Sequence, residues 1–299
     1  MKKFDVVVLT DNRYINPVEI NDYNRNVLLE DELVQKALEK LDLRVQRLSW
    51  DDPDFDWSTT HYALFRTTWD YFDRFDEFST WLKTASKQTN FINSESIINW
   101  NIDKHYLQDL EKNGVRCAQT LFIEAGSKKS LAQYHKETNW SETVLKPVIS
   151  GGARHTYKLN FTNLHSHETI FKELIANEAF MLQPFQHAIV EKGELSLIVI
   201  DGEFTHAVLK IAKKGDFRVQ DDFGGTVHTY TPTKTEIEFA EQAVNACKSK
   251  PVYARVDMFM DNNGQLAIAE LELIEPELWF RNNTKAADKL ALTIKKMFD

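Results

Sequence analysis

The chain has 299 residues, a formal net charge of -9 and 42% hydrophobic residues, a composition that can bury a sizeable core and excludes disordered and fibrous proteins. No apolar run approaches the ~18 residues of a membrane span, and a net negative surface is unsuited to general nucleic-acid binding. The two cysteines, Cys117 and Cys247, lack CxxC spacing, which excludes a disulfide framework. We therefore expect a soluble cytoplasmic protein with roughly two domains or one large one.

Short apolar runs alternate with amphipathic segments in the first 95 residues. Strands are predicted at 4–10, 43–48 and 61–65, and helices at 28–41 and 75–84. This alternation predicts a small α/β layer with a parallel sheet. Polar clusters at 11–14 and 66–70 follow the first and third strands, and ligands bind at such strand ends. Neither cluster contains a Gly-rich phosphate turn, so the layer is not a dinucleotide-binding Rossmann unit.

From about residue 95 the pattern changes to that of a mixed α+β body with antiparallel hairpins. Helices are expected at 101–110, 162–177, 235–249 and 284–298, and strands at 119–123, 142–148, 180–185, 195–200, 203–212, 225–231, 252–260 and 266–273. The turns Asp201-Gly202 and 261–264 each join two of these strands into a hairpin.

Three carboxylates fall in the last predicted hairpin. Glu270 and Glu272 are two residues apart on one strand, so their side chains share a face, and Asp257 on the partner strand can face the same pair. Such carboxylates repel each other unless a cation lies among them, and hard oxygen ligands suit Mg²⁺. The alternative is an exposed strand face whose acids are solvated.

Glycine is scarce, with 10 residues, and four of them form the pairs Gly151-Gly152 and Gly224-Gly225. Lys146 ends an apolar strand just before the first pair, where backbone N–H groups and the ammonium can together face a phosphate. Arg218 precedes the second pair, and arginine binds phosphate through paired hydrogen bonds. For Lys146, for Lys104 on a predicted helix and for Arg218 in a polar connection, the alternative is an ordinary surface position.

In their order and spacing these motifs resemble those of the ATP-grasp enzymes. The resemblance rests on a lysine that begins the central domain, Lys-Pro before a Gly-rich loop, Met-Leu-Gln-Pro-Phe, Gly-Glu-Leu-Ser, Arg before Gly-Gly, Arg-Val-Asp and Glu-Leu-Glu, over about residues 100–280. The chain most resembles the glutathione-synthetase-like branch and within it the cycloserine-synthetase-like group, with which it shares Trp-Asp-Tyr, Trp-Asn-x-Asp-Lys and Glu-Leu-Glu-Leu-Ile-Glu-Pro.

The resemblance implies an ATP-grasp fold in three parts. These are a pre-ATP-grasp α/β domain at 1–95, an N-terminal ATP-grasp subdomain with the lysines and the Gly-rich loop at 96–185, and a C-terminal subdomain with the metal-binding carboxylates at 186–299. It implies ATP and Mg²⁺ as cofactors, a small-molecule substrate, no nucleic-acid or membrane partner, and a homodimer or homotetramer.

The resemblance also implies roles for individual residues. The implied ATP ligands are Lys104, Lys146, Ser150, Gly151, Gly152, Arg154, Gln183, Phe185 and Glu191. Arg218 and Arg255, with Lys146, would act at the γ-phosphate or at the acyl phosphate made from it, and Asp257, Glu270 and Glu272 would hold Mg²⁺. Many members of the family have Asn in place of Glu272, so the number of metal ions stays open.

Acceptor recognition is assigned to the polar clusters of the first layer. The candidate residues are Asn12, Arg13, Arg66, Trp69 and Asp70. Arg13 or Arg66 could pair with a substrate carboxylate and Asp70 with an amine, while Trp69 could equally belong to the core between domains.

The implied function is that of an ATP-dependent carboxylate-amine ligase. A carboxylate of an amino acid or related small molecule would attack the γ-phosphate of ATP, and a nitrogen would then displace phosphate from the acyl phosphate to form an amide-type bond. The alternatives are a small-molecule kinase on the same fold and a non-catalytic ATP-binding protein.

Overall fold

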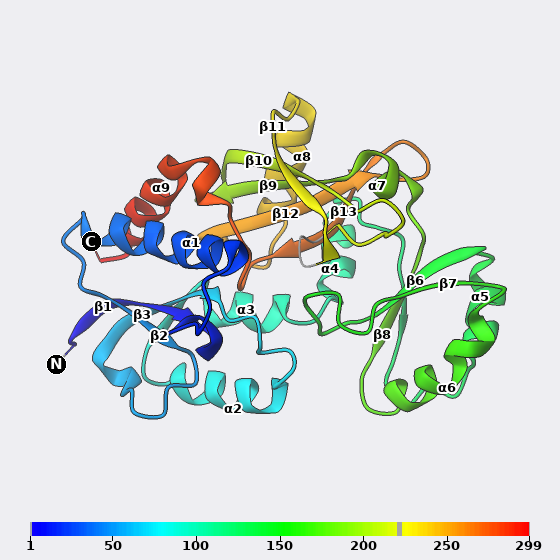
Figure 1. Ribbon diagram of the computed structural model, residues 1–299, viewed down its shortest axis with the longest axis horizontal. Coiled ribbons are helices and arrows are strands. Elements are labelled where there is room, and N and C mark those ends of the chain that lie inside the picture. Colours follow the sequence, from blue (N-terminus) through cyan, green and yellow to red (C-terminus); the bar gives the residue numbers. More distant parts are fainter. Residues whose placement is uncertain (1, 220–222, 299) are drawn as a thin grey trace.

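The computed structural model describes residues 2–219 and 223–298. The chain forms three sheets, which follow one another in the sequence (Figure 1). Of the predicted connection between Arg218 and Gly224-Gly225, Asp221 and Asp222 lie outside the described residues. Within the described ranges, no helix is both long and apolar enough to cross a membrane.

The first sheet is parallel, as the sequence predicts. Its strands, in the order β2-β1-β3-β4, are β1 (Phe4–Thr10), β2 (Val45–Ser49), β3 (Thr60–Thr67) and β4 (Asn90–Ile92). Helices α1 (Asp22–Glu39) and α2 (Phe75–Ala85) cover opposite faces, because alternate residues of β1 point to opposite sides. Helix α1 begins six residues before the predicted start, since the Asn21 side chain accepts a hydrogen bond from the backbone N–H of Asn24.

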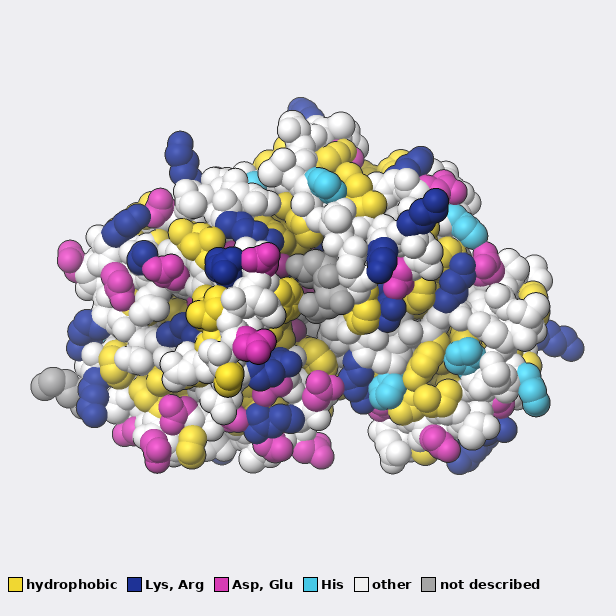
Figure 2. Space-filling view, in the orientation of Figure 1, with side chains coloured by type: hydrophobic (Ala, Val, Ile, Leu, Met, Phe, Trp, Pro, Cys, Tyr) yellow, Lys and Arg dark blue, Asp and Glu magenta, His cyan; other side chains and the backbone are white. Residues whose placement is uncertain are grey.

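The second sheet forms a lobe of its own, on the right in Figure 1. Its antiparallel strands, in the order β5-β8-β6-β7, are β5 (Leu121–Ile123), β6 (Glu142–Pro147), β7 (Tyr157–Asn160) and β8 (Phe180–Pro184). Helices α5 (Leu131–Thr138) and α6 (Leu164–Ile175) pack on one face. The space-filling view shows a notch between this lobe and the rest of the molecule (Figure 2).

The third sheet contains both predicted hairpins. Its antiparallel strands, in the order β11-β10-β9-β12-β13, are β9 (Glu194–Ile200), β10 (Glu203–Ile211), β11 (Thr226–Tyr230), β12 (Tyr253–Met260) and β13 (Leu266–Glu272). Asp201 and Gly202 have φ values of +55° and +82°, the left-handed conformation that a type I′ hairpin turn needs.

Helix packing connects parts of the chain that are distant in sequence. Helices α3 (Glu95–Asn101) and α4 (Tyr106–Lys112) pack with α8 (Lys234–Asn245) on the third sheet, whereas α9 (Thr284–Lys295) packs against α1. The short helix α7 (His187–Lys192) leads into β9. The single helix predicted at 101–110 is wrong in its bounds, because α3 and α4 are separated by a break at 102–105 that contains Lys104.

Both thiols should resist modification in the folded protein. Burial raises the pKa of Cys117 and of Cys247 to about 12, so the reactive thiolate is scarce at pH 8. We expect neither thiol to react with Ellman's reagent at pH 8 on the time scale of minutes, and both to react once the chain is unfolded in guanidinium. Prompt labelling of either thiol in the native protein would contradict these pKa values.

Candidate active site

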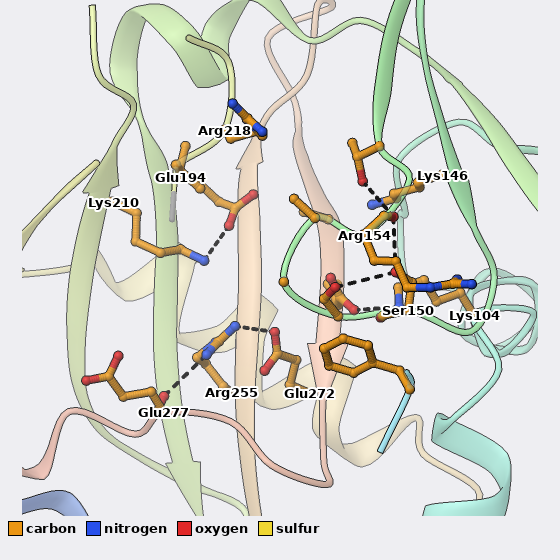
Figure 3. A pocket seen from close by; sticks show the side chains of 18 of the residues that line it. Lys104, Lys146, Ser150, Arg154, Glu194, Lys210, Arg218, Arg255, Glu272 and Glu277 are labelled. Atoms are coloured by element: carbon orange, nitrogen blue, oxygen red, sulfur yellow. Dashed lines mark hydrogen bonds and ion pairs between the residues drawn. The ribbon is translucent and has the colours of Figure 1, made fainter. Parts of the chain in front are cut away.

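A cavity of about 640 Å³ lies where the three sheets meet, a size within the roughly 300–1,000 Å³ of small-molecule sites. One wall is lined by Lys104, which lies between α3 and α4, and by Lys146 and the Gly-rich loop of the second lobe. Residues of β10, β12 and β13 line the other wall. Figure 3 shows the two walls: Lys104, Lys146, Ser150 and Arg154 face Glu194, Lys210, Arg218 and Arg255. The third contribution comes from aromatic residues of the first layer.

The two predicted phosphate-binding lysines are brought together, although they are 42 positions apart. Lys104 lies in the break between α3 and α4, donates a hydrogen bond from Nζ to the Ser150 carbonyl (2.6 Å) and forms an ion pair with Glu270 (3.0 Å). Lys146 lines the cavity from β6. Burial and the nearby Lys104 lower the pKa of Lys146, although the Glu270 carboxylate opposes them. An anion between the two ammonium groups would relieve their repulsion.

The Gly-rich loop lies against the first layer. Arg154 forms a two-point ion pair with Glu178 (2.8 and 3.0 Å), and its Nε lies 3.8 Å from Asp73. A Cβ atom at Gly151 would lie 2.5 Å from the Phe72 ring. The close approach of Phe72 therefore favours glycine here, and residues 150–154 of the loop line the cavity beside it.

Gly151→Ala should open this loop. The added methyl group would push it away from Phe72, at a cost of about 1–3 kcal/mol for overpacking. We therefore expect Mg-ATP affinity to fall roughly 5- to 150-fold, as measured by isothermal titration calorimetry. The double variant with Phe72→Ala should regain most of this affinity, and an unchanged affinity of Gly151→Ala would show that loop position and nucleotide binding are independent.

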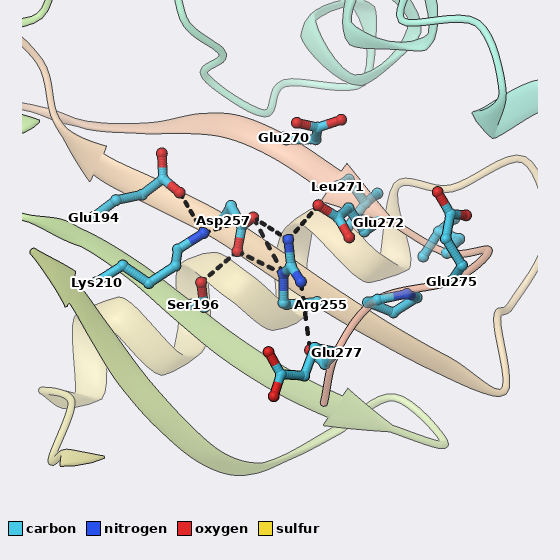
Figure 4. A network of polar contacts seen from close by, with 12 residues as sticks. Glu194, Ser196, Lys210, Arg255, Asp257, Glu270, Leu271, Glu272, Glu275 and Glu277 are labelled. Atoms are coloured by element: carbon cyan, nitrogen blue, oxygen red, sulfur yellow. Dashed lines mark hydrogen bonds and ion pairs between the residues drawn. The ribbon is translucent and has the colours of Figure 1, made fainter. Parts of the chain in front are cut away.

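The three predicted metal ligands lie on one face of the β12–β13 hairpin. Asp257 is paired directly with Glu270, and Glu272 with Arg255. Asp257 accepts hydrogen bonds from Ser196 (2.5 Å) and Arg255 (2.9 Å), while Glu272 forms an ion pair with Arg255 (Figure 4). In the described part of the chain no three or more His, Cys, Asp or Glu side chains converge in a metal-binding arrangement, so each carboxylate binds a protein cation instead.

The pKa values of the carboxyl groups on this face indicate that it can accept additional positive charge. Burial opposes ionisation of Asp257, but Arg255 and Lys210 hold its pKa at about 2, below its usual range. Burial raises the pKa of Glu272 to about 8, and repulsion from Asp257 and Glu270 adds to the shift. The donor atoms are hard carboxylate oxygens, so the chemistry of the face fits a divalent cation such as Mg²⁺.

Two residues that the sequence analysis did not select belong to this site. Lys210 on β10 is 7% exposed and forms ion pairs with Glu194 (2.5 Å) and Asp257 (3.1 Å). Both Lys210 and Glu194 line the cavity. Lys210 lies inside the apolar run Ala-Val-Leu-Lys-Ile, the same signal that identified Lys146 in Thr-Val-Leu-Lys-Pro.

Arg218 and the predicted adenine and ribose ligands differ in whether they line the cavity. Arg218 lines the cavity but is bound to Asp216 (2.7 Å). Gln183 and Phe185 line it from β8 and the residue that follows. Glu191 is exposed on α7 and does not line the cavity, although Ile189 and Val190 of the same helix do.

Of the five predicted acceptor residues, the structure brings Arg13 and Trp69 to the cavity. Trp69 also packs edge-on against Tyr14, with ring centroids 5.9 Å apart. Asn12 is exposed elsewhere, and Asp70 accepts a hydrogen bond from the Trp50 indole (2.7 Å) away from the cavity.

The predicted role of Arg66 needs correction. Its side chain is 0% exposed, forms an ion pair with Glu30 (3.2 Å) and donates a hydrogen bond to the Pro276 carbonyl (2.8 Å). The segment after β13 covers this strand end, so Arg66 does not line the cavity. We therefore assign Arg66 a structural role.

Comparison with known proteins gives matches along most of the chain. Residues 6–93 match the family model described as the N-terminal domain of D-cycloserine synthetase DcsG, and residues 115–261 match the ATP-grasp domain of prokaryotic glutathione synthetase. The cycloserine biosynthesis protein DcsG of Streptomyces lavendulae is 26% identical over 276 residues, which cover 86% of this chain and 88% of that protein.

Solved structures show the same fold. The crystal structure of D-cycloserine synthetase DcsG superposes with a TM-score of 0.86 at 24% identity, covering 98% of this chain and 99% of that one. D-alanine–D-alanine ligase from Bacillus anthracis, complexed with ATP, superposes with a TM-score of 0.62 at 12% identity, covering 98% and 96%.

Proposed function

The chain belongs to the ATP-grasp superfamily, in its glutathione-synthetase-like branch, and from this premise we propose that it is an ATP- and Mg²⁺-dependent ligase that forms an amide-type C–N bond. The substrate would be an amino acid or a related small molecule. A cytoplasmic location and a homodimer or homotetramer are part of the same proposal.

One observation carries the proposal. Lys104 and Lys146 face a sheet surface that bears Arg255, Glu270 and Glu272 across one cavity. Cations on one wall suit the phosphates of substrate ATP, and carboxylates on the other suit the metal ion that accompanies those phosphates. The aromatic side of the cavity, with Trp69, is then left for the acceptor.

Binding of ATP with Mg²⁺ would give the cations and the carboxylates of the cavity new ion-pair partners. Lys104 and Arg255 now neutralise Glu270 and Glu272, and phosphate oxygens would replace these carboxylates as their partners. The released carboxylates, with Asp257, would hold Mg²⁺, which supplies charge neutralisation at the transferring phosphate. These ion pairs therefore hold both sets of groups in position for the nucleotide.

The remaining chemistry is positioning. Arg13 at the cavity wall is a candidate partner of the substrate carboxylate, which attacks the γ-phosphate to give an acyl phosphate and ADP. Arg218 and Arg255 would stabilise the negative charge that develops there. The loop at 150–154 lines the cavity, and its closure over bound nucleotide would keep water from hydrolysing the acyl phosphate.

Product analysis tests the proposal. The protein is incubated with Mg-ATP and a panel of L- and D-amino acids and their O- and N-substituted derivatives, with Lys146→Met as the inactive control. A ligase releases ADP and free phosphate together with a product that has lost one water. ADP release with the phosphate retained on the product would identify a kinase, and a failure to consume ATP with any member of the panel would contradict the ligase assignment.

A further inference from the structure

We infer that Glu275 is the group that takes the proton from the attacking nitrogen when the C–N bond forms, a role that rests on the ligase function proposed above. Glu275 belongs to the strap, our name for residues 275–280, which follows β13 and crosses from the third sheet to the first layer.

The position of Glu275 is that of a group between the two substrates. It lines the cavity three residues beyond Glu272 (Figure 4). The Tyr71 hydroxyl donates a hydrogen bond to its carboxylate, and the Trp69 indole donates one to its backbone carbonyl (2.8 Å). Glu275 therefore lies where the phosphate-binding wall, with Lys104 and Glu270, meets the aromatic acceptor wall.

Its charge environment differs from that of the other cavity carboxylates. These carboxylates all form ion pairs with protein cations: Asp73 with Arg154, Glu194 with Lys210, Glu270 with Lys104, Glu272 with Arg255, and Glu277 with Arg281. Glu275 forms no ion pair with any residue that the structure describes, and its hydrogen-bond partner Tyr71 is neutral because burial raises the pKa of that phenol well above its usual value. Phosphate binding and metal binding would thus leave Glu275 available.

The pKa of Glu275 suits the role of a proton acceptor. Burial raises the pKa of its carboxyl group to about 7, and the Glu270 carboxylate adds to the shift while Tyr71 and Lys104 oppose it. A carboxylate with a pKa near the working pH is a better proton acceptor than an ordinary one, and a substantial fraction of it is still ionised.

The strap itself is held rigidly. The buried Glu30 carboxylate accepts hydrogen bonds from the backbone N–H groups of Leu278 (2.7 Å) and Phe280 (2.8 Å), and Arg66 donates one to the Pro276 carbonyl (2.8 Å). A proton acceptor must be within hydrogen-bond reach of the nitrogen, and the hydrogen bonds at Pro276, Leu278 and Phe280 limit the movement of Glu275 from its C-terminal side.

The proposed step is balanced in atoms and electrons. The nitrogen lone pair attacks the acyl carbon of the acyl phosphate, the C–N bond forms, and the C–O bond to phosphate breaks with its electron pair on the leaving phosphate. The N–H proton passes to the Glu275 carboxylate and from there to solvent. Tyr71 keeps its proton and orients the carboxylate.

The test compares Glu275→Gln with wild type on the panel member that gives the fastest ADP release. We expect kcat to fall roughly 10²- to 10⁴-fold, the usual contribution of a general base, with KM for that acceptor within about threefold of wild type. Tyr71→Phe should cause a smaller loss, about tenfold, because the carboxylate remains but is less well oriented. Glu203→Gln, an exposed site on β10, is the matched control.

Hydroxylamine separates this role from others. It attacks acyl phosphates as a neutral nucleophile, so hydroxamate formation in Glu275→Gln should stay within about threefold of wild type, since the first half-reaction is intact. A raised KM with unchanged kcat would make Glu275 a binding group, and a parallel loss of hydroxamate would place it in the first half-reaction. Either result, or full activity, overturns the inference. If wild type forms neither product nor hydroxamate, the ligase function itself fails and the inference with it.

Discussion

Asp257→Asn should lower the rate of ATP turnover by at least about 10³-fold. Asp257 is 3% exposed and binds Ser196, Lys210 and Arg255 at once. The neutral amide would remove a predicted metal ligand and also the charge that holds the lysine and the arginine in position.

The same substitution should destabilise the fold to a measurable extent. Breaking a buried ion pair leaves an uncompensated charge, at a cost of about 3–5 kcal/mol, but Lys210 keeps Glu194 and Arg255 keeps Glu272. We therefore expect a loss near the lower limit, about 3 kcal/mol, in urea unfolding. Asp54→Asn, at an exposed position, is the control for both measurements, and turnover within tenfold of wild type would rule out the central role of Asp257.

Glu30→Gln should cause the largest loss of stability, about 3–5 kcal/mol of unfolding free energy. Glu30 is 1% exposed and is the acidic partner of the fully buried Arg66. The amide would remove the carboxylate charge that pairs with the guanidinium and would set its N–H₂ group against one of the two backbone N–H groups, of Leu278 or of Phe280, that now donate to Glu30.

A neighbouring residue on the same helix gives a matched control. Glu32 forms an ion pair with Lys36 at the surface, with side chains 53% and 61% exposed, and such pairs contribute about 0–1 kcal/mol. Glu32→Gln should therefore have little effect in urea unfolding. Removing the buried cation as well, in Glu30→Gln with Arg66→Met, should recover part of the loss. Equal effects of Glu30→Gln and Glu32→Gln would show that the buried pair does not stabilise the strap.

Elements with a clear hydrophobic period were predictable from the sequence. Strand β1 was predicted with its exact bounds, and the Asp201-Gly202 turn identified the hairpin of β9 and β10. The short strands β4 and β7 and the short helices α5 and α7 were not predicted. Segments this short contain too few repeats of the hydrophobic pattern to be recognised in the sequence, and contacts with distant parts of the chain stabilise them.

The candidate site was predictable in part for a similar reason. Local order along the chain identified Lys146 beside a Gly-rich loop and the carboxylates of β13, because strand alternation decides which side chains share a face. It did not identify Lys210, because no Gly-rich loop follows that apolar strand as one follows Lys146, and it did not identify Glu275, which lies in a loop. Both became candidates only when the structure showed which polar groups surround them.

The sequence by itself determined the family, the parallel first layer, the two hairpins and the types of residue available to bind phosphate and metal, because these follow from local periodicity and motif order. The tertiary structure decided which charged side chains face the cavity. Arg66 lies at the end of β3 and Trp69 follows that strand, yet the strap, about 210 residues further along the chain, buries Arg66 while Trp69 remains at the cavity wall. Exposure at a strand end depends on what covers it, and the covering segment is brought there by contacts that no local pattern encodes.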